Sequence, residues 1–389
     1  MKIKSINHYK DLHGKKVLLR VDFNVPIKGG KVLDDYRILK ALDTINFLLN
    51  HDCKIILITH LGKPNPDKRE EQFSVKPIVR KLTQLLGKKI RVIDNFASLA
   101  GGTILGKMKA GEIVMLENIR YEKGELTNDV KLAKKLAKLA EVYVNDAFSV
   151  CHRAEASVSA IKKYIPSYAG LLLEQEVLSL NKALHPVDPL VVLIGGAKIK
   201  TKIKLIKNLQ KKAHRVMIGG ALANNFFKVD GFNVGKSMID KEYLDFAKKL
   251  DRKNILLPVD VVVSASKTGG DIKIRKLNEI TDRDYIFDIG PETIKLYAHE
   301  IKKAKTIIWN GPMGFFEIKI FKTGTMALAQ YVAARSKGPT FGVVGGGETV
   351  EALRALKMEY GIDWISTGGG AMLSYLGGEK MPGLEGLVS

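Results

Sequence analysis

Four apolar stretches in the second half of the chain run directly into glycine clusters. The stretches end at Ile194, Ile218, Val344 and Thr367, and the clusters are Gly195-Gly196, Gly219-Gly220, Gly345 to Gly347 and Gly368 to Gly370. An apolar, β-branched run predicts a buried strand, and glycine permits the tight turn that starts a helix. Backbone N–H groups at a helix start bind anions because they have no intrahelical acceptor. Four such turns predict a surface for a polyphosphate, most simply a nucleotide.

Two lysines follow the first glycine cluster. Lys198 and Lys202 are expected one turn apart on the helix that Gly195-Gly196 opens. Two ammonium groups on one face, beside free N–H donors, would neutralise phosphate charge during transfer. A solvated lysine stripe is the alternative for this pair alone.

Two further segments of the second half carry groups that suit a nucleotide. Residues 309–317 are predicted to be a strand end entering a constrained turn, whose aromatic and apolar groups either flank an adenine or belong to the core. Glu317 could hold a ribose hydroxyl. Glu348, after the triple glycine, is either a magnesium carboxylate or an acid favoured by the helix dipole.

The first half carries polar residues where its predicted strands end. They are Asp22 and Asn24, His60 and Lys63, Asn118 and Arg120, and Asn145 and Asp146, with Arg37, His152 and Arg153 nearby. In parallel α/β sheets ligands lie outside the carboxyl ends of the strands. Guanidinium forks bind phosphate and carboxylate bidentately. Any single arginine is more simply a surface ion pair, but the whole set predicts a site for a small anion carrying phosphate and carboxylate.

The elements that must position these residues alternate between strands and helices. Strands are predicted at 16–26, 55–58, 90–93, 113–116 and 142–144, helices at about 36–50 and 75–86, and a lysine-rich helix capped by Asn128. A longer helix at about 170–184 precedes a second alternating block that starts at Leu190. This order predicts an α/β protein with two doubly wound, Rossmann-like parallel-sheet domains joined by an interdomain helix and hinge.

Composition narrows the class of protein. No apolar stretch approaches the roughly 20 residues that span a bilayer, and the first residues lack the apolar segment of a signal peptide. Two cysteines, Cys53 and Cys151, indicate a reducing compartment, so a cytoplasmic protein is expected. Cys151 is interpreted as a buried, inert thiol.

The formal net charge of +22 fits either nucleic-acid binding or a solvated lysine-rich surface, and the spread of the lysines along the chain favours the solvated surface.

One apparent phosphate loop is excluded by its spacing. Residues 231–237 place three residues between the two glycines, where the phosphate-loop motif has four. Phosphates must therefore be bound in another way.

The chain resembles phosphoglycerate kinase over essentially its whole length. The motifs that carry the resemblance, in order, are residues 20–26, 34–38, 60–64, 117–121, 145–148, 152–154, 195–198, 309–314, 345–349 and 366–371. The resemblance implies a monomeric hinge-bending enzyme of glycolysis and gluconeogenesis. Such an enzyme moves a phosphoryl group reversibly between 1,3-bisphosphoglycerate and ADP with Mg²⁺. It also implies domains at 1–170 for phosphoglycerate and 186–371 for nucleotide, an interdomain helix at 171–185, and a segment at 372–389 that returns to the first domain.

The resemblance also assigns roles to individual residues. It implies that phosphoglycerate is bound by Asp22, Phe23, Asn24, Arg37, His60, Leu61, Gly62, Lys63, Arg120 and Arg153. It implies that the nucleotide is bound by Gly196, Ala197, Lys198, Lys202, Gly219, Gly220, Asn310, Pro312, Gly314, Glu317, Gly346, Gly347, Glu348 and Thr349. The implied catalytic groups are Arg37, Lys198 and the amides of Gly368, Gly369 and Gly370, and Glu348 is the implied magnesium ligand.

The sequence departs from the family pattern at four positions in or next to these motifs. Lys63 replaces an arginine, which removes a bidentate fork, and Glu348 replaces an aspartate. Glu155 replaces a histidine and Thr201 an acidic residue. Two other functions are considered: an acyl-phosphate kinase for another small carboxylate, and a basic nucleic-acid-binding protein with a vestigial nucleotide site. The second does not explain the histidine and arginines at the strand ends.

Overall fold

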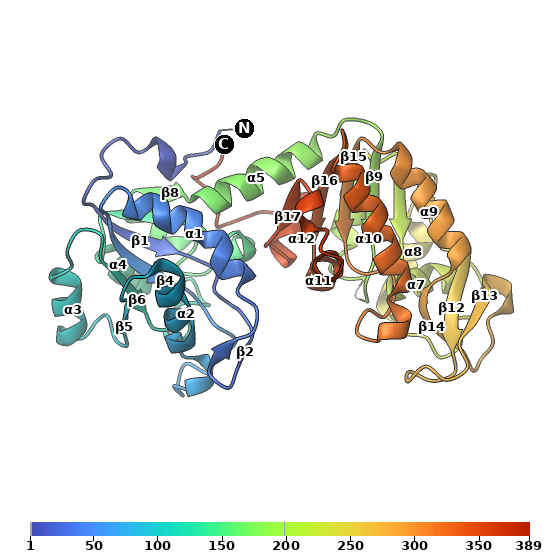
Figure 1. Cartoon of the computed structure of the whole chain (residues 1–389), viewed down its shortest axis with the longest axis horizontal. Coiled ribbons are helices and arrows are strands. Elements are labelled where there is room, and N and C mark those ends of the chain that lie inside the picture. The colour runs from blue at the N-terminus through green and yellow to red at the C-terminus, as the bar shows by residue number, and fades with distance from the viewer. Residues whose placement is uncertain (1, 198) are drawn as a thin grey trace. The chain divides into compact units, whose positions relative to one another are not determined.

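The computed structural model describes residues 2–197 and 199–389 and divides into two compact units (Figure 1). The first unit comprises Met1–Val177 and Lys380–Ser389, and the second comprises Leu178–Glu379. Each unit contains a six-stranded parallel sheet. The prediction of two doubly wound α/β domains is therefore confirmed.

The first sheet has the strand order β5-β6-β4-β1-β7-β8. Its strands are β5 (Arg91–Ile93), β6 (Ile113–Leu116), β4 (Lys54–Ile58), β1 (Lys16–Arg20), β7 (Val142–Asn145) and β8 (Ser167–Ala169). Each strand pairs in parallel with its neighbours. A short antiparallel hairpin, β2 (Ile27–Lys28) and β3 (Lys31–Val32), follows β1.

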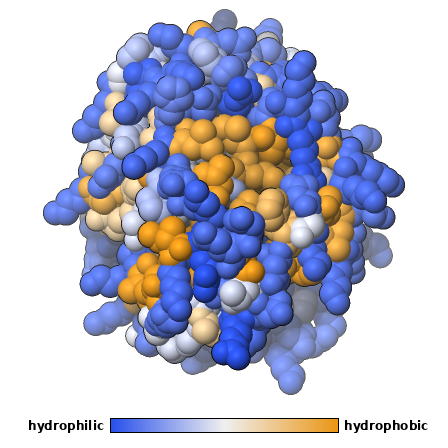
Figure 2. Space-filling view, turned by 90° about the vertical axis from the view of Figure 1, so that its right-hand side faces the viewer, coloured by the Kyte–Doolittle hydropathy of each residue, from blue (hydrophilic) through white to orange (hydrophobic). Residues whose placement is uncertain are grey.

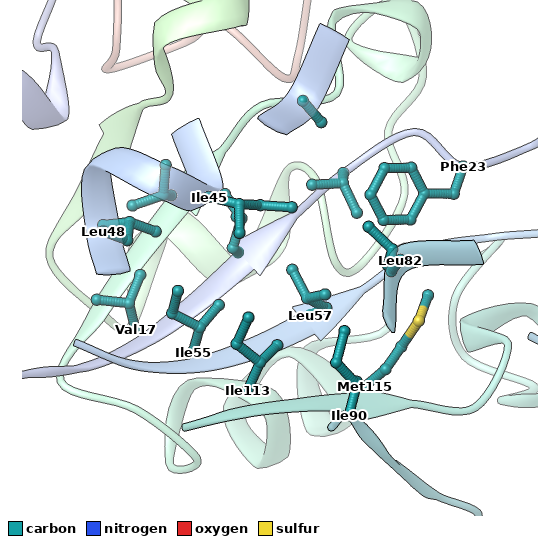
Figure 3. Packing of buried hydrophobic residues seen from close by; sticks show 14 of the residues in the cluster. Val17, Phe23, Ile45, Leu48, Ile55, Leu57, Leu82, Ile90, Ile113 and Met115 are labelled. Carbon is teal, nitrogen blue, oxygen red and sulfur yellow. The ribbon is translucent and has the colours of Figure 1, made fainter. Parts of the chain in front are cut away.

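The core of the first unit lies on both faces of this sheet. Because side chains alternate along a strand, Val17 and Leu19 of β1 face one cluster and Leu18 faces another. The first cluster includes Ile45 and Leu82 (Figure 3), which belong to α1 (Tyr36–Leu49) and α2 (Lys76–Leu86). The second cluster includes residues of α3 (Leu99–Gly106) and α4 (Val130–Ala137). Helices therefore cover both faces, which leaves only the edges of the sheet open to ligands.

The second sheet has the strand order β11-β10-β9-β15-β16-β17. Its strands are β11 (Ile255–Leu256), β10 (Arg215–Ile218), β9 (Leu190–Ile194), β15 (Thr306–Asn310), β16 (Phe341–Gly345) and β17 (Trp364–Ser366). A separate three-stranded antiparallel sheet, which the sequence does not predict, contains β12 (Asp260–Ser264), β13 (Lys273–Lys276) and β14 (Tyr285–Ile289). All four stretches that precede the glycine clusters are strands of the parallel sheet.

Helices of the second unit begin after most of these strands. They are α6 (Ile203–Leu209), α7 (Ala221–Val229), α8 (Leu244–Lys249), α9 (Pro291–Lys303), α10 (Thr323–Ser336), α11 (Gly347–Ala355) and α12 (Gly370–Leu376). Glycines cap α7, α11 and α12 directly, as predicted. The first cluster differs, because α6 begins only at Ile203 and Lys202 is its N-cap. The helix α5 (Leu171–Leu184) contains the boundary between the two units.

Two expectations about local structure are wrong. The first predicted strand ends at Arg20 rather than at residue 26, because the chain bends into a loop toward the polar residues. Asn128 does not cap α4. Its backbone has a positive φ of 56°, its side-chain oxygen accepts from the N–H of Ala160, and Asp129 caps the helix by accepting from Leu132.

The two ends of the chain are paired within the first unit (Figure 1). The N–H of Lys2 donates to the carbonyl of Ser389 at 2.7 Å, and the N–H of Ser389 donates to Lys2 at 2.9 Å. The ammonium group of Lys162 donates to the carbonyls of Pro382 and Glu385, both at 2.7 Å. These bonds fix the last ten residues to the first sheet and its loops.

Gly383→Ala is expected to lower the free energy of unfolding by about 1–3 kcal/mol, because a methyl group there overpacks the core. A Cβ at position 383 would lie 2.7 Å from the Cα of Cys151 and 2.8 Å from its sulfur. Urea unfolding monitored by circular dichroism measures the change. Gly102→Ala in α3 is the matched control, since a Cβ there meets no atom within 4 Å. Equal midpoints for the two variants would contradict the packing of this segment.

Candidate active site

An ion pair stands at the carboxyl end of β1. Asp22 accepts from the guanidinium of Arg37, the second residue of α1, and from the hydroxyl of Ser149. Its other oxygen accepts from the backbone N–H of Asn24 at 3.1 Å. Burial raises the pKa of Asp22, but Arg37 and these hydrogen bonds outweigh it, so the net pKa is below its usual value. The ionised carboxylate therefore holds Arg37 at the edge of the sheet.

A buried, neutral histidine lies at the end of β4. Burial lowers the pKa of His60 well below its usual value, and the charges of Arg20, Arg120 and Arg153 lower it further. The Nη2 atom of Arg20 lies 3.4 Å from Nδ1 of His60. Because a guanidinium only donates, Nδ1 accepts and Nε2 carries the proton. His60 is thus an uncharged donor among cations.

Three arginines meet at one buried carboxylate. Arg120 donates from Nη2 to Oε1 of Glu155 at 3.0 Å and from Nη1 to the carbonyl of Gly62 at 2.6 Å. The Nη1 atom of Arg153 lies 3.5 Å from the same Oε1, and Nη2 of Arg20 lies 3.9 Å from Oε2. Arg120 is 6% exposed and Arg153 is 44% exposed. Arg153 is therefore the more accessible cation.

The loop after β4 is fixed between its neighbours. Asn118, at the end of β6, donates to the carbonyl of Leu61 at 2.7 Å and accepts from its N–H at 3.1 Å. Asn24 accepts from the N–H of Gly62 at 2.9 Å. A Cβ at Gly62 would clash with the ring of Phe73, and its φ of 61° also favours glycine. The loop is held rigidly at the edge of the sheet.

The predicted substrate-binding residues of the first unit fall into two groups. The side chains of Asp22, Asn24, Arg37, His60, Arg120 and Arg153 lie in the network at the carboxyl edge of the sheet. Phe23 and Leu61 have buried apolar side chains that belong to the core, so only their backbones are available to a ligand. Lys63 is exposed on the loop beside Gly62.

Two residues predicted to line the pocket are structural instead. Asn145 donates to the carbonyl of Gly383 at 3.3 Å, and Asp146 accepts from the N–H of Leu173 at 3.1 Å. Both side chains are buried and bind these segments instead of facing the candidate site, so the expectation that they face an anion is wrong. They attach the end of β7 to the C-terminal segment and to the start of α5. Burial raises the pKa of the neighbouring Cys151 thiol to about 12, as expected for an inert thiol.

In the second unit, the glycines allow neighbouring strand ends to touch through their backbones. A Cβ at Gly195 would clash with the carbonyl of Pro312, and a Cβ at Gly219 would clash with the sulfur of Met313. The N–H of Gly196 donates to Pro312 at 2.7 Å, and that of Gly220 donates to Met313 at 2.8 Å. The expectation of free amides at these two clusters is therefore wrong, because the amides bind backbone carbonyls.

The other two clusters differ from these. Gly346 and Gly369 are N-caps with φ values of 99° and 50°, which place glycine directly before α11 and α12. The first N–H groups of a helix have no intrahelical acceptor. The N–H of Gly368, by contrast, donates to the hydroxyl of Ser366 at 3.1 Å. The available amides are those at the starts of the two helices.

A cavity of about 420 Å³ lies beside these strand ends. The predicted nucleotide-binding residues that line it are Gly196, Ala197, Gly220, Pro312, Gly314, Glu317 and Glu348. Some other predicted nucleotide-binding residues lie behind the cavity wall. Gly219 packs on Met313. Asn310, Gly346 and Thr349 lie around Gly311, and the N–H of Gly311 donates to the Thr349 hydroxyl at 2.9 Å. Lys198 lies outside the described residues. The predicted set thus splits into a cavity wall and the supports behind it.

The apolar part of the cavity comes mainly from residues that sequence reasoning did not identify. Phe227, Met238, Tyr285 and Phe287 line it, together with Phe315 from the predicted turn at 309–317. The rings of Phe287 and Phe315 are stacked with centroids 5.9 Å apart. Trp309, which was considered as an adenine contact, is instead fully buried and donates to the carbonyl of Gly311.

The excluded phosphate loop also contributes to the cavity. Lys236 and Ser237 line it, although residues 231–237 do not precede a helix in the manner of a phosphate loop. The hydroxyl of Ser237 accepts from the N–H of Ile286 at 2.8 Å.

Figure 2 shows one face of the molecule, where a hydrophobic patch is surrounded by a mostly hydrophilic surface. The hydrophilic part is what a lysine-rich surface is expected to show.

A buried lysine and an acidic residue stand near the glycine turns. Lys202 is 7% exposed, and burial lowers its pKa to about 8 against the opposing charge of Glu348. Lys202 lies beside Gly196, because a Cβ there would come within 2.9 Å of the ammonium nitrogen. Glu348 is exposed in the first turn of α11 and lines the cavity. Among the described residues, no group of three or more acidic, histidine or cysteine side chains could hold a metal.

Sequence reasoning also missed the positioning groups of the first unit. Arg20 is fully buried and donates to the hydroxyl of Ser157 at 3.0 Å and to the carbonyl of Val21 at 2.6 Å. The available signal was an arginine directly after the apolar run Val17 to Leu19. Ser149 gave no such signal, because its contact with Asp22 joins residues 127 positions apart.

Comparison with known proteins gives one consistent family. A family model described as phosphoglycerate kinase matches residues 6–379. A phosphoglycerate kinase of Dictyoglomus turgidum is 42% identical over 383 residues, which cover 96% of each chain. A solved structure of phosphoglycerate kinase from Coxiella burnetii has a TM-score of 0.88 at 38% identity and covers 99% of each chain. A phosphoglycerate kinase structure from Pyrococcus horikoshii has a TM-score of 0.86 at 31% identity and covers 98% of each chain.

Asp146→Asn is expected to flatten the pH dependence of unfolding. Burial raises the pKa of Asp146 to about 7, whereas the pKa of an aspartate in an unfolded chain is about 4. The contribution of Asp146 to stability is therefore complete below pH 4 and is lost as the pH rises through 7. Urea unfolding from pH 5 to 8 measures the slope, and exposed Glu242→Gln is the control. A slope unchanged by Asp146→Asn would show that this carboxyl does not titrate in that range.

Proposed function

Because the chain belongs to the phosphoglycerate kinase family, we propose that its first unit binds the phosphoglycerate and its second unit the nucleotide. The chain is a phosphotransferase with a carboxyl group as acceptor. It transfers a phosphoryl group reversibly between 1,3-bisphosphoglycerate and ADP, a step of glycolysis. The observation that carries the assignment is the convergence of Arg37, His60 and Arg153 at the carboxyl edge of the first sheet.

The phosphoglycerate site matches the chemistry of that ligand. Arg153 and Lys63 are accessible cations for its phosphate. The Nε2–H of His60 donates to an oxygen without adding charge. Asp22 and Asn24 would accept from its hydroxyl group. Arg37, one-third exposed and held by Asp22, reaches the carboxylate that receives the phosphoryl group.

The nucleotide site uses the cavity of the second unit. Its aromatic and apolar residues suit a purine ring, and Glu317, which lines the same cavity, would bind a ribose hydroxyl. Lys202 and the amides at the start of α11 bind the phosphates, and a buried ammonium group interacts with them more strongly than an exposed one. Lys198 is proposed to act on the transferring phosphoryl group.

Magnesium is proposed to accompany the nucleotide. Mg²⁺ is usually held by one or two carboxylates together with substrate phosphates, so a single carboxylate is a sufficient protein ligand. Glu348 lines the cavity and is exposed, which fits this role. When bound, the ion neutralises phosphate charge during transfer.

Catalysis is proposed to rest on positioning and charge. The carboxylate of 3-phosphoglycerate attacks the γ-phosphorus of ATP in line, the bond from that phosphorus to the β–γ bridging oxygen breaks, and ADP leaves. The transferring group spreads its charge over three oxygens. Arg37, Lys198 and the amides of Gly369 and Gly370 would meet that charge. The amide of Gly368 is less available, because it donates to Ser366.

We further propose that the protein acts as a monomer in the cytoplasm. Both cysteines are free and buried, which fits a reducing compartment. None of the described helices is long and apolar enough to cross a membrane.

Arg37→Lys is expected to lower kcat by about 100-fold or more, since it keeps the charge but loses the guanidinium fork. The measurement is a coupled assay with magnesium-ATP and 3-phosphoglycerate that follows reduction of the acyl phosphate. Arg91→Lys, at a surface ion pair with Glu112, is the control and should keep full activity. Near-normal turnover in Arg37→Lys would remove Arg37 from the reaction.

Glu348→Gln is expected to raise the Mg²⁺ concentration for half-maximal activity by about five- to tenfold, because an amide binds the ion more weakly than a carboxylate. Mg²⁺ titration at fixed ATP measures the change. Glu351→Gln, an exposed acid on the same helix, is the matched control. If the two variants titrate alike, the ion is held without Glu348.

A further inference from the structure

Glu155 is a buried acid in the middle of the cationic edge of the first sheet. Its side chain is only 3% exposed, and its Oε1 atom is shared between Arg120 at 3.0 Å and Arg153 at 3.5 Å. Its other oxygen lies 3.9 Å from Arg20. A buried carboxylate is strongly destabilising unless it is paired, so the three guanidiniums and Glu155 hold one another in place.

The backbone around Glu155 is fixed independently of the arginines. The carbonyl of Glu155 accepts from Val158 at 3.0 Å and from Ser159 at 2.7 Å. The N–H of Ala156 donates to the carbonyl of Glu125 at 2.9 Å. The carboxylate of Glu155 therefore extends from an anchored turn, and the arginines are oriented by it.

A second buried acid leaves Glu155 available for the two arginines of the candidate site. Both oxygens of Glu125 accept from Ser157, at 2.9 Å from its N–H and 2.5 Å from its hydroxyl. That hydroxyl in turn accepts from Arg20 at 3.0 Å. Arg20 thus has its own partners, and among the described contacts the only hydrogen bond that the carboxylate of Glu155 accepts comes from Arg120.

We propose that Glu155 is a positioning residue for substrate binding, which holds Arg120 against the loop at Gly62 and presents Arg153 to the phosphate of 3-phosphoglycerate. This inference rests on the proposed phosphoglycerate site. A carboxylate at this position keeps two adjacent guanidiniums from repelling one another before the anion arrives. It also offsets one positive charge, so the arginines are better ordered but the net positive charge of the site is smaller.

The test is the steady-state kinetics of Glu155→Gln with 3-phosphoglycerate and magnesium-ATP. Because the amide keeps an acceptor but loses the charge-assisted bond, the KM for 3-phosphoglycerate should rise about tenfold. The KM for ATP and the kcat at saturation should stay within about twofold. Glu112→Gln removes an equal charge from the same unit at the surface pair with Arg91 and is the control. A lower KM for 3-phosphoglycerate in Glu155→Gln would overturn the proposal, because charge alone would then govern binding.

A double-mutant cycle separates positioning from a general effect on the fold. Arg153→Gln combined with Glu155→Gln should raise KM by less than the product of the single effects, since the two side chains act together. Lys63→Gln should combine with Glu155→Gln multiplicatively, because Lys63 makes no ion pair with Glu155 among the described residues. Multiplicative behaviour in both pairs would overturn the proposal.

The single variants also distinguish a failure of the positioning role of Glu155 from a failure of the proposed phosphoglycerate site. If Arg153→Gln raises the KM for 3-phosphoglycerate and Glu155→Gln does not, the positioning role alone is wrong. If neither Arg153→Gln nor Lys63→Gln changes that KM, the proposed site is wrong and the role of Glu155 with it. Should Glu155→Gln fail to fold, Glu155→Asp keeps the charge and shortens its reach, and a KM unchanged in that variant would overturn the proposal.

Discussion

Parallel pairing of strands is the constraint on which both candidate sites depend. Every strand of each six-stranded sheet points the same way, so the loops that follow all of them meet at one edge. Helices cover the faces of the first sheet, and only the edge is open for ligands. Residues as distant in sequence as Asp22 and Ser149 become neighbours there. The chemistry of each unit then depends on which side chains its strand ends carry.

The two edges solve the problem of binding an anion in different ways. In the first unit, cations are oriented by buried acids, with Asp22 holding Arg37 and Glu155 holding Arg120. His60 stays uncharged among them and adds a donor without adding repulsion. In the second unit, the first two glycine clusters let neighbouring backbones pack closely together. The other two clusters precede α11 and α12 and leave amides at the starts of these helices. Fixed donors replace flexible charged side chains there.

Sequence alone predicted the fold class and most polar residues of the first edge, because apolar runs and strand ends are local signals. It failed where a contact joins distant segments. Asn145 and Asp146 follow a strand as the pattern requires, yet they bind the C-terminal segment and α5. The amides of Gly196 and Gly220 meet carbonyls contributed by residues about 100 positions away. The aromatic side of the cavity comes partly from β14, whose antiparallel sheet leaves no distinct pattern in the sequence.

The central claim, that the two ligands bind at separate edges, is tested most directly by calorimetric titration of each ligand into two variants. Arg153→Gln should weaken 3-phosphoglycerate binding about tenfold or more and leave magnesium-ADP binding unchanged. Lys202→Met should do the reverse, because it removes a buried ammonium group from the nucleotide phosphates alone. Loss of the same ligand in both variants would contradict the account, as would unchanged binding of both ligands in either variant.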